Sequence, residues 1–249
     1  MLWAGTGIKT RLMQRAYLWT HERREDGAAR YAPHGVEVRV DDRADLALRH
    51  LLARGGAYEE EEALLIRRHL ARGTPVVELG GCIGIVSALI RDVIGPDAPH
   101  VVVEANPRIA PLALENAARA AAPGATTLLR AAVDYSGAAT VRFAAGANQH
   151  AGRVARGAEP GFEAPTTTLS AVVDRLGAER FALVCDIEGA ERDLVRHEAA
   201  VLGRCDLAVI ETHPQAYSAA DLRDIDARLL AAGLHRVEAI ADVVAYARA

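Results

Sequence analysis

The sequence predicts an α/β fold in which seven strands form a doubly wound, mostly parallel sheet. Short apolar runs rich in valine alternate with helical segments from residue 75 onward, glycines or acidic residues follow several of these runs, and two strand-like runs close the chain. Continuous apolar strands that alternate with helices indicate a parallel sheet that is covered on both faces. We therefore expect such a sheet with an antiparallel C-terminal edge strand and an N-terminal helical appendage.

The predicted elements follow one another in a regular order. The predicted strands are residues 75–79, 100–104, 126–133, 181–186, 205–212, 234–240 and 243–249. The predicted helices are residues 60–70, 85–94, 109–121, a segment that starts near residue 189, and 218–232, which Ser218 and Asp221 begin as a capping box. The last two strands are separated by a hairpin-length turn, which is why we expect an antiparallel edge.

The composition is that of an ordinary globular protein. The chain has 249 residues, 33 acidic and 29 basic side chains, and a formal charge of −4. Nucleic-acid binders usually carry a basic excess, so we expect no nucleic-acid partner. Cys82, Cys185 and Cys205 lie in or beside apolar runs, which is typical of reduced thiols and of a cytoplasmic protein.

Residues 1–55 are predicted to form the N-terminal appendage, and residues 56–249 the domain that holds the sheet. The appendage contains a strand at 36–40 and a helix at 45–53, with Asp45 in a capping position. These 55 residues carry no motif, and we expect them to shape the substrate side.

An amphipathic helix is predicted near the N-terminus, where Leu12, Ala16 and Trp19 lie at helical spacing with Arg11 and Arg15 between them. We expect its apolar side to pack on the domain or on a second subunit of a homodimer. No apolar run approaches the roughly 18 residues of a membrane span, so we expect no membrane partner.

The first strand of the sheet ends in a glycine-rich turn, Glu78-Leu-Gly80-Gly81-Cys82-Ile-Gly84. Gly80 and Gly84 carry no Cβ, so this turn can bring its backbone close to a ligand at the start of the next helix. Cys82 occupies the place of the second glycine in a dinucleotide fingerprint, and no Gly-Lys-Ser/Thr follows. The turn therefore indicates neither a dinucleotide site nor a phosphate-binding loop.

Glu104 ends the second strand, about 20 residues after the turn, where a carboxylate can accept both hydroxyl hydrogens of a ribose. A glycine turn followed by such an acid is the pattern of S-adenosylmethionine binding. The alternative is a turn that packs a helix on its strand, with a solvated acid at the strand end. At the third strand end, Asp134 could accept from an adenine amine or open a turn before Ser136. The predicted cofactor-binding residues are Glu78, Gly80, Gly81, Cys82, Gly84, Glu104, Ala105, Asn106, Ala132, Asp134 and Asp186.

With these residues, the chain resembles the FkbM family of S-adenosylmethionine-dependent methyltransferases. The similar segments are VVELGGCIGIVS (76–87), VVVEANP (101–107), TTTLSAVVD (166–174), LVCDIEGAERDLV (183–195) and VIETHP (209–214), preceded by GAYEEEE (56–62). Cys82 departs from the asparagine common in the family, and Glu78 replaces the more usual aspartate. The resemblance implies a Rossmann-like class I methyltransferase fold, S-adenosylmethionine as cofactor with S-adenosylhomocysteine as product, and methylation of a small-molecule hydroxyl on a sugar or natural-product scaffold.

An alcohol needs its proton removed as it attacks, so an O-methyltransferase needs a base. The fourth and fifth strand ends offer Asp186, Glu188 and Glu191 on one side, and Glu211 and His213 on the other. We expect His213 or Asp186 to be the base and Glu188 to orient the substrate. The alternative is that acids at a helix start serve only as favourable capping charges.

Other interpretations stay open. The same acids with His213 could hold a divalent cation, which is not favoured because no tight ligand spacing supports it. The enzyme could methylate a carboxylate or an amine on a peptide or small molecule, or the chain could be a non-catalytic S-adenosylmethionine-binding scaffold. Residues 135–165 are predicted to be a long loop in which Asn148, Gln149 and His150 could touch substrate.

Overall fold

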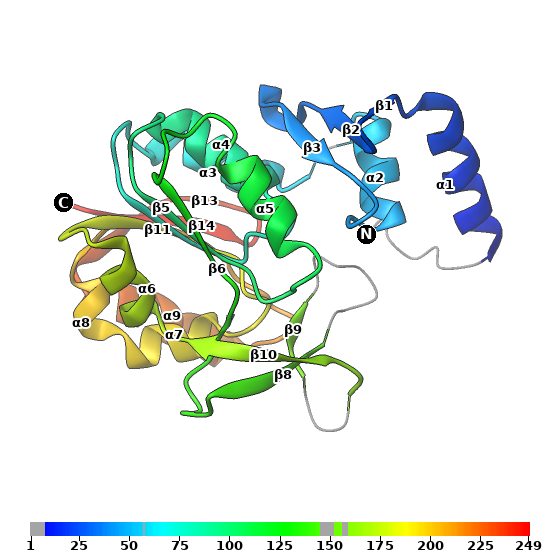
Figure 1. The fold of residues 1–249 in the computed structure, drawn as a ribbon. Helices are drawn as coiled ribbons and strands as arrows, with labels where there is room; N and C mark the ends of the chain where they lie inside the picture. Colours follow the sequence, from blue (N-terminus) through cyan, green and yellow to red (C-terminus); the bar gives the residue numbers. More distant parts are fainter. Residues whose placement is uncertain (1–7, 57, 145–151, 156–158) are drawn as a thin grey trace.

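A seven-stranded sheet forms the centre of the molecule, in a computed structural model that describes residues 8–56, 58–144, 152–155 and 159–249 (Figure 1). The strand order is β13-β14-β12-β11-β4-β5-β6. The strands are β4 (Val76–Leu79), β5 (His100–Val103), β6 (Thr126–Leu129), β11 (Phe181–Cys185), β12 (Cys205–Glu211), β13 (Leu234–Ile240) and β14 (Val243–Arg248). The five strands from β12 to β6 run parallel to one another, which confirms the predicted Rossmann-like class.

The antiparallel strand at the end of the chain is confirmed, but its place differs from the prediction. β14 runs antiparallel to both β12 and β13 and lies between them, so β13 is the edge strand. Four consecutive residues of β14, Val243 to Tyr246, are buried, whereas β13 exposes several of its side chains. A strand that is apolar on both faces is buried best inside a sheet, which gives β14 the inner position.

Helices cover both faces of the sheet (Figure 1). Four helices pack on one face: α6 (Leu169–Leu176), α7 (Glu191–His197), α8 (Ala199–Leu202) and α9 (Ala219–Ala231). Three pack on the other: α3 (Glu60–His69), α4 (Ile85–Ile94) and α5 (Ala110–Ala117). Successive side chains of β4 point to opposite faces of the sheet, so Val77 and Leu79 pack in the core under the first group of helices and Val76 packs in the core under the second.

The order of strands reverses beside β4, which has β5 on one side and β11 on the other. Chain connections leave β4 and β11 in opposite directions, so the carboxyl ends of these strands open a crevice between them. Doubly wound sheets bind ligands at this switch point.

The N-terminal part forms a small layer of its own against α4 and α5. It contains α1 (Ile8–His21), β1 (Arg24–Glu25), β2 (Ala28–Tyr31), a short 3₁₀ turn η1 (Pro33–Gly35), β3 (Val38–Val40) and α2 (Leu46–Ala53). The predicted strand and helix correspond to β3 and α2, and Asp45 caps α2 by accepting from the Leu48 N–H at 2.8 Å. The antiparallel pairing of β1 with β2 and of β2 with β3 was not predicted. Asn116 of α5 ties β3 to the domain through the backbone N–H and carbonyl of Arg39.

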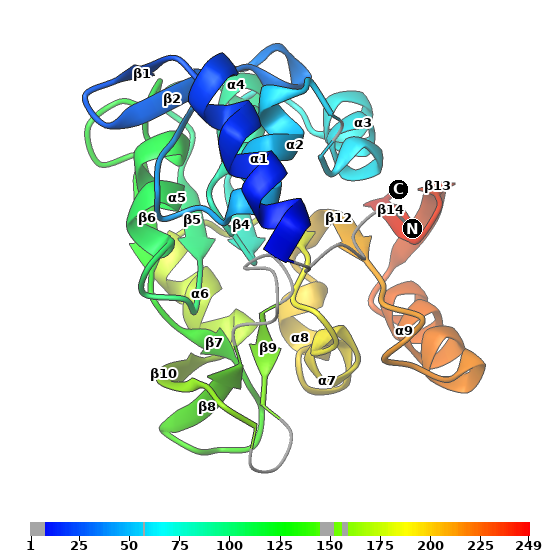
Figure 2. The ribbon, with the colours of Figure 1, turned by 90° about the vertical axis from the view of Figure 1, so that its right-hand side faces the viewer.

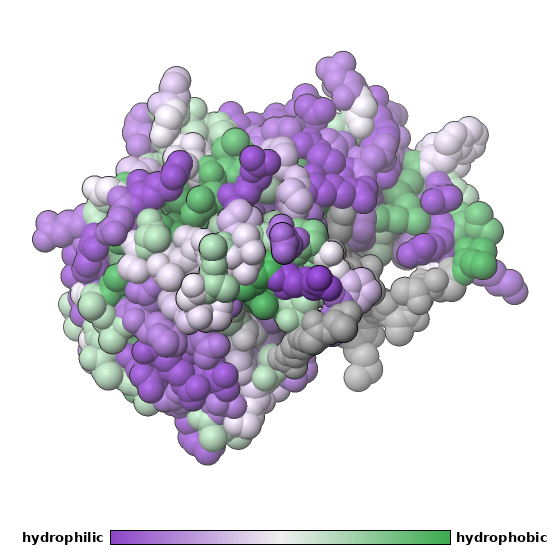
Figure 3. Space-filling model, turned by 60° about the horizontal axis from the view of Figure 1, so that its bottom comes forward, coloured by the Kyte–Doolittle hydropathy of each residue, from purple (hydrophilic) through white to green (hydrophobic). Residues whose placement is uncertain are grey.

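The apolar stripe predicted on the first helix does not pack on the domain. α1 contacts α2 through its other side, where Leu18 is buried, while Leu12 is 58% and Trp19 is 87% exposed. Apolar side chains stand out at the end of the molecule where α1 lies (Figure 3). Within the described residues no helix has both the length and the apolar character needed to cross a bilayer.

The predicted loop at 135–165 is wrong in part, because residues 140–144, 153–154 and 162–165 are strands of a second sheet (Figure 2). Its order is β7-β10-β8-β9, from β7 (Ala132–Val133), β8 (Thr140–Ala144), β9 (Arg153–Val154) and β10 (Phe162–Thr167). The third predicted strand therefore splits: β6 ends at Leu129, and β7 leaves the main sheet to pair in parallel with β10. Asn148, Gln149 and His150 lie outside the described residues.

Candidate functional site

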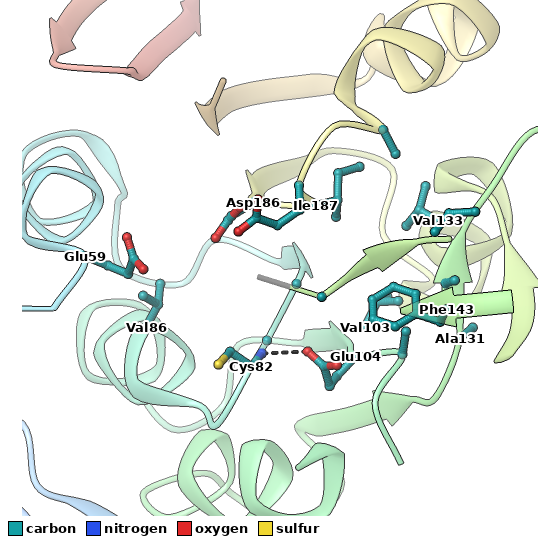
Figure 4. A pocket seen from close by; sticks show the side chains of 18 of the residues that line it. Glu59, Cys82, Val86, Val103, Glu104, Ala131, Val133, Phe143, Asp186 and Ile187 are labelled. Carbon is teal, nitrogen blue, oxygen red and sulfur yellow. Dashed lines mark hydrogen bonds between the residues drawn. The ribbon is translucent and has the colours of Figure 1, made fainter. Parts of the chain in front are cut away.

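A pocket of about 800 Å³, including its open mouth, lies at the carboxyl ends of β4, β5 and β11 (Figure 4). Of the predicted residues, those that line it are Gly80, Gly81, Cys82, Glu104, Ala105, Ala132, Asp186 and Glu188. The sheet thus brings together, in one cavity, residues that are up to 108 positions apart in the sequence.

Gly80 allows the glycine turn to lie against the end of β11. Its φ is +95°, and a Cβ at this position would lie 1.8 Å from the carbonyl oxygen of Asp186. Gly84 has a φ of +84° and would place a Cβ 2.7 Å from the carbonyl oxygen of Ala113. Gly80 therefore shapes the pocket, whereas Gly84 permits α4 to pack on α5 and is absent from the pocket lining.

Glu104 is held in a fixed orientation by two backbone donors. Its Oε2 accepts from the Cys82 N–H at 2.8 Å, and its Oε1 accepts from the Asn106 N–H at 2.7 Å (Figure 4). The side chain is 7% exposed and lines the pocket. Burial raises the pKa of Glu104 to about 7, against the opposing effect of the backbone donors. Each oxygen keeps a lone pair, so the carboxylate can accept two further hydrogen bonds from a ligand diol.

Glu78 is not placed in the pocket, although it was a predicted cofactor residue. Its Oε1 accepts from the Ser87 hydroxyl at 2.8 Å, and its Oε2 lies 2.9 Å from His100 Nε2. The side chain is 2% exposed. Strand alternation turns Glu78 under α4, whereas the cavity lies beyond the end of the strand, so this acid supports the packing of α4 on the sheet.

Two further predicted residues, Asn106 and Asp134, lie outside the pocket lining. The Asn106 side chain accepts from the Arg108 N–H at 3.0 Å in the turn before α5. Asp134 accepts from the Ser136 N–H at 2.9 Å, which is the turn-opening role that the sequence left open as an alternative.

The second sheet closes an apolar end of the pocket. Phe143 of β8 and Val133 of β7 line it (Figure 4), together with Val154 of β9, Ala132 of β7 and Ala105. Phe143 and Val154 were missed because this segment was predicted to be a loop. The sequence signal that could have found them is the alternation of apolar and polar side chains in Thr-Val-Arg-Phe-Ala at 140–144.

Two acids at the start of α3 also belong to the pocket and were not predicted. Glu59 and Glu62 line the pocket. Glu62 is 3% exposed and has no hydrogen-bond or ion-pair partner within the described part of the chain. Burial, reinforced by neighbouring carboxylates, raises the pKa of Glu59 to about 7 and that of Glu62 well above its usual range. The spacing of three, which places two acids on one side of a helix, is the signal that could have found them.

His213 gathers the carboxylates of the fourth and fifth strand ends. Its Nε2 lies 3.3 Å from Asp186 Oδ1, 3.3 Å from Glu188 Oε2 and 4.0 Å from Glu211 Oε1. Its Nδ1 lies 3.2 Å from Glu191 Oε1, within ion-pair distance although not aligned as a hydrogen bond. The structure thus brings together all five side chains that the sequence proposed for this rim.

The electrostatics of this rim distinguish the two predicted bases. Burial by itself would lower the pKa of His213, but the charges of Glu191, Glu188 and Glu211 outweigh it and raise this pKa to about 9. Burial and the neighbouring acids raise the pKa of Asp186 well above its usual range. At neutral pH His213 is therefore an imidazolium that cannot accept a proton, and Asp186 is the better candidate base.

Glu191 is a positioning residue rather than a pocket residue. It is 1% exposed, is absent from the pocket lining and accepts from the Gly189 N–H at 3.1 Å and from the Tyr217 hydroxyl. Burial opposes its ionisation, but His213 and Tyr217 outweigh burial and hold the pKa of Glu191 below its usual value. Glu191 therefore stays ionised and fixes both the turn and the His213 ring.

We expect the unliganded protein to lose stability as the pH rises from 5.5 to 8.5. Glu104 has a folded pKa of about 7 against about 4.5 when unfolded, so its burial costs increasing free energy above pH 4.5, up to about 3 kcal/mol. His213, with its pKa raised to about 9, stabilises the fold below pH 6.5, and this contribution disappears as the pH approaches 9. Urea unfolding at pH 5.5, 7 and 8.5 measures the effect.

Acids with lowered pKa values, such as Asp41 and Asp224, are ionised throughout this window and do not oppose the trend. A Glu104→Gln variant should lose the part of the slope below pH 7. A free energy of unfolding that stays constant or increases from pH 5.5 to 8.5 would contradict this account of the pocket.

No family model matches the sequence, and no curated protein matches it. Solved structures with a similar fold include a TehB-like SAM-dependent methyltransferase from Corynebacterium glutamicum (TM-score 0.45, 12% identity, 82% of this chain and 95% of that chain). Another is magnesium protoporphyrin IX methyltransferase with bound SAH from Synechocystis (TM-score 0.42, 12% identity, 77% of this chain and 81% of that chain). A third is fibrillarin with S-adenosyl-L-methionine from Aeropyrum pernix (TM-score 0.42, 16% identity, 90% of this chain and 83% of that chain). At these identities the similarity is one of fold, so the chemistry of the pocket rests on its own residues.

Proposed function

We propose that this chain is an S-adenosylmethionine-dependent methyltransferase that methylates a hydroxyl group of a small molecule. The observation that carries the proposal is that Glu104, the Gly80 turn and Asp186 line one pocket at the switch point of the sheet. A ribose-binding acid, a backbone that a ligand can approach closely and a candidate base are thereby within reach of one ligand.

The pocket residues fit an adenosyl ligand from one end to the other. The apolar end formed by Ala132, Phe143 and Val154 suits an adenine ring, and Glu104 beside it is free to accept from two ribose hydroxyls. The turn at Gly80 and Cys82 would then hold the methionine part. S-adenosylmethionine supplies an electrophilic methyl group on a positively charged sulfur.

The charge of the pocket also supports this ligand. Glu59, Glu62, Asp186 and Glu188 line it, and the described part of the lining includes no lysine or arginine. Their raised pKa values reflect burial together with mutual repulsion. A ligand with a sulfonium and an ammonium group relieves this repulsion, whereas a phosphate-bearing nucleotide would increase it.

Proton removal falls to Asp186 in this proposal. A hydroxyl must lose its proton as its oxygen attacks, and a carboxylate with a raised pKa is a suitable acceptor near neutral pH. His213 holds Asp186 and Glu188 in place through its positive charge, and Glu188 orients the acceptor at the mouth.

The resemblance to the FkbM family supports a sugar or natural-product hydroxyl as acceptor. An amine acceptor is the second candidate, favoured by the surplus of carboxylates at the rim, which would attract a cationic group. An amine that attacks as the free base needs less help from Asp186, so the Asp186→Asn variant described in the Discussion separates the two acceptors.

The direct test is calorimetry with S-adenosylhomocysteine. We expect Glu104→Gln to weaken binding by about 1 to 3 kcal/mol, because charge-assisted hydrogen bonds to the ribose are lost. Asp134→Asn is the matched control: this acid also follows a strand end, but its contact is with Ser136, and affinity should not change. Equal affinity of wild type and Glu104→Gln would remove the ribose assignment.

A further inference from the structure

The rim of the pocket holds a group of donor atoms that the proposed reaction uses only in part. One oxygen each of Asp186 and Glu188 and the Nε2 of His213 lie within 4.8 Å of one another. Nε2 is 3.3 Å from each of the two oxygens. Ligands about 2.1 Å from an ion lie about 3.0 to 3.4 Å apart in octahedral or tetrahedral sites, so the two distances from Nε2 match those between neighbouring ligands of one ion.

Two of the atoms in this cluster are buried without a hydrogen-bond partner in the described structure, namely Asp186 Oδ1 and His213 Nδ1. His213 is 5% exposed, and its Nε2 is directed at the two carboxylates. Each of the two atoms has an ion-pair contact that is not aligned as a hydrogen bond, Oδ1 with His213 Nε2 and Nδ1 with Glu191 Oε1. Buried polar atoms are nearly always hydrogen-bonded, so Asp186 Oδ1 still offers a lone pair to a ligand of the cluster.

The residues around His213 are arranged like those that orient a metal-binding histidine. A ligating histidine commonly directs its other ring nitrogen at a carboxylate, which fixes the ring and its tautomer. Glu191 lies in that position, 3.2 Å from Nδ1, and is itself held by Tyr217 and the Gly189 N–H. A metal ion that displaces the Nε2 proton would leave the other proton on Nδ1, facing Glu191, and would bind the lone pair of Nε2.

The charge of the cluster is only partly compensated, by His213 and by the more distant charge of Arg153 near Glu188. Asp186, Glu188, Glu191 and Glu211 surround a single imidazole, and no arginine or lysine of the described chain forms an ion pair with any of them. One proton on His213 offsets one negative charge, whereas a divalent ion would offset two. Carboxylate oxygens combined with an imidazole suit Mn²⁺ or another first-row transition ion better than Ca²⁺.

We infer that Asp186, Glu188 and His213 form a binding site for one divalent transition-metal ion at the mouth of the pocket, with Glu191 as the positioning residue for His213. The site rests on the proposed function in one respect, since its ion would lie beside the acceptor. There it would bind the acceptor oxygen and lower the pKa of the hydroxyl. The O–H bond breaks with its electron pair left on oxygen, and the proton passes to the second carboxylate oxygen of Asp186.

The test is a metal titration of the full chain that does not depend on methyl transfer. After removal of metals with a chelator, equilibrium dialysis against Mn²⁺ should load about one ion per chain, with an electron paramagnetic resonance signal of protein-bound Mn²⁺. We expect Glu188→Gln and His213→Ala to weaken Mn²⁺ binding at least about tenfold, and Glu191→Gln by about 10- to 100-fold. Glu188 is partly exposed, so its variant keeps the test valid should the His213 variant fail to fold.

Two matched controls should bind Mn²⁺ as the wild type does: His235→Ala, on the exposed side of edge strand β13, and Glu179→Gln, just before β11 at the opposite end of that strand. Absence of saturable Mn²⁺ and Zn²⁺ uptake overturns the site, as does uptake that Glu188→Gln and Glu191→Gln leave unchanged. Binding of S-adenosylhomocysteine in the same samples separates the two ideas. A chain that binds the nucleoside but no metal loses only this site, and one that binds metal but no nucleoside loses only the proposed function.

Discussion

Replacement of Asp186 by asparagine is expected to lower kcat by about 10²- to 10⁴-fold while S-adenosylhomocysteine still binds. A positioned base contributes about this much to the rate when a proton must leave in the transition state. Asparagine keeps the size of the side chain next to Gly80 and His213 but accepts no proton. Steady-state kinetics with a hydroxyl acceptor, together with calorimetry of the product cofactor, measure the two quantities separately.

The matched control for this variant is Asp206→Asn, an acid of β12 near the other end of the sheet, where it pairs with Arg180. Its kcat should equal that of the wild type. If Asp186→Asn retained near-full activity, the base assignment would be wrong, and an amine or carboxylate acceptor, which needs no such base, would become the better proposal.

Replacement of Gly80 by alanine is expected to abolish cofactor binding and to destabilise the fold by about 3 kcal/mol or more. The added methyl carbon would lie 1.8 Å from a backbone oxygen of Asp186, so neither a rotamer change nor a flexible side chain can relieve the contact. The turn after β4 or the end of β11 must move, and both line the pocket. Denaturant unfolding and calorimetry with S-adenosylhomocysteine measure the two effects.

Gly124→Ala controls for the backbone conformation alone. Gly124 has a φ of +83°, near the +95° of Gly80, but a Cβ there would meet nothing within 4 Å. This variant should lower the free energy of unfolding by only about 1 kcal/mol, the cost of placing alanine at positive φ, and should leave cofactor affinity unchanged. If both variants lost similar stability and both still bound the cofactor, the close approach of the two strand ends would not matter for the pocket.

Local patterns were sufficient to predict the elements whose signals are carried by neighbouring residues. Helix α4 begins and ends where the sequence places it, at Ile85 and Ile94, because a glycine precedes it and another follows it. The capping box at Ser218 and Asp221 is present with both of its hydrogen bonds. The second sheet was missed because its strands are short and separated by long connections, so their pairing is not visible in the sequence.

The residues of the candidate site likewise include some whose place could be predicted from local sequence and others whose place could not. The place of Glu104 in the pocket could be predicted because it depends on a strand end and on a spacing from the glycine turn. The position of Glu78 outside the pocket could not be predicted, because it depends on which face of the sheet the side chain meets. On that face Glu78 contacts Ser87 and His100. The same limit applies to Glu62, whose place in the pocket depends on how α3 packs.

The sequence by itself determined the succession of main-sheet strands and their helices along the chain, the glycine turn and the set of acids at the strand ends, because these follow from periodicity and from residues close together in the chain. Only the tertiary structure decided which of those acids share a cavity and how their protons are distributed. Desolvation and mutual repulsion depend on distances between strands, and with the charge of Glu191 they raise the pKa of His213 to about 9 and that of Asp186 well above its usual range.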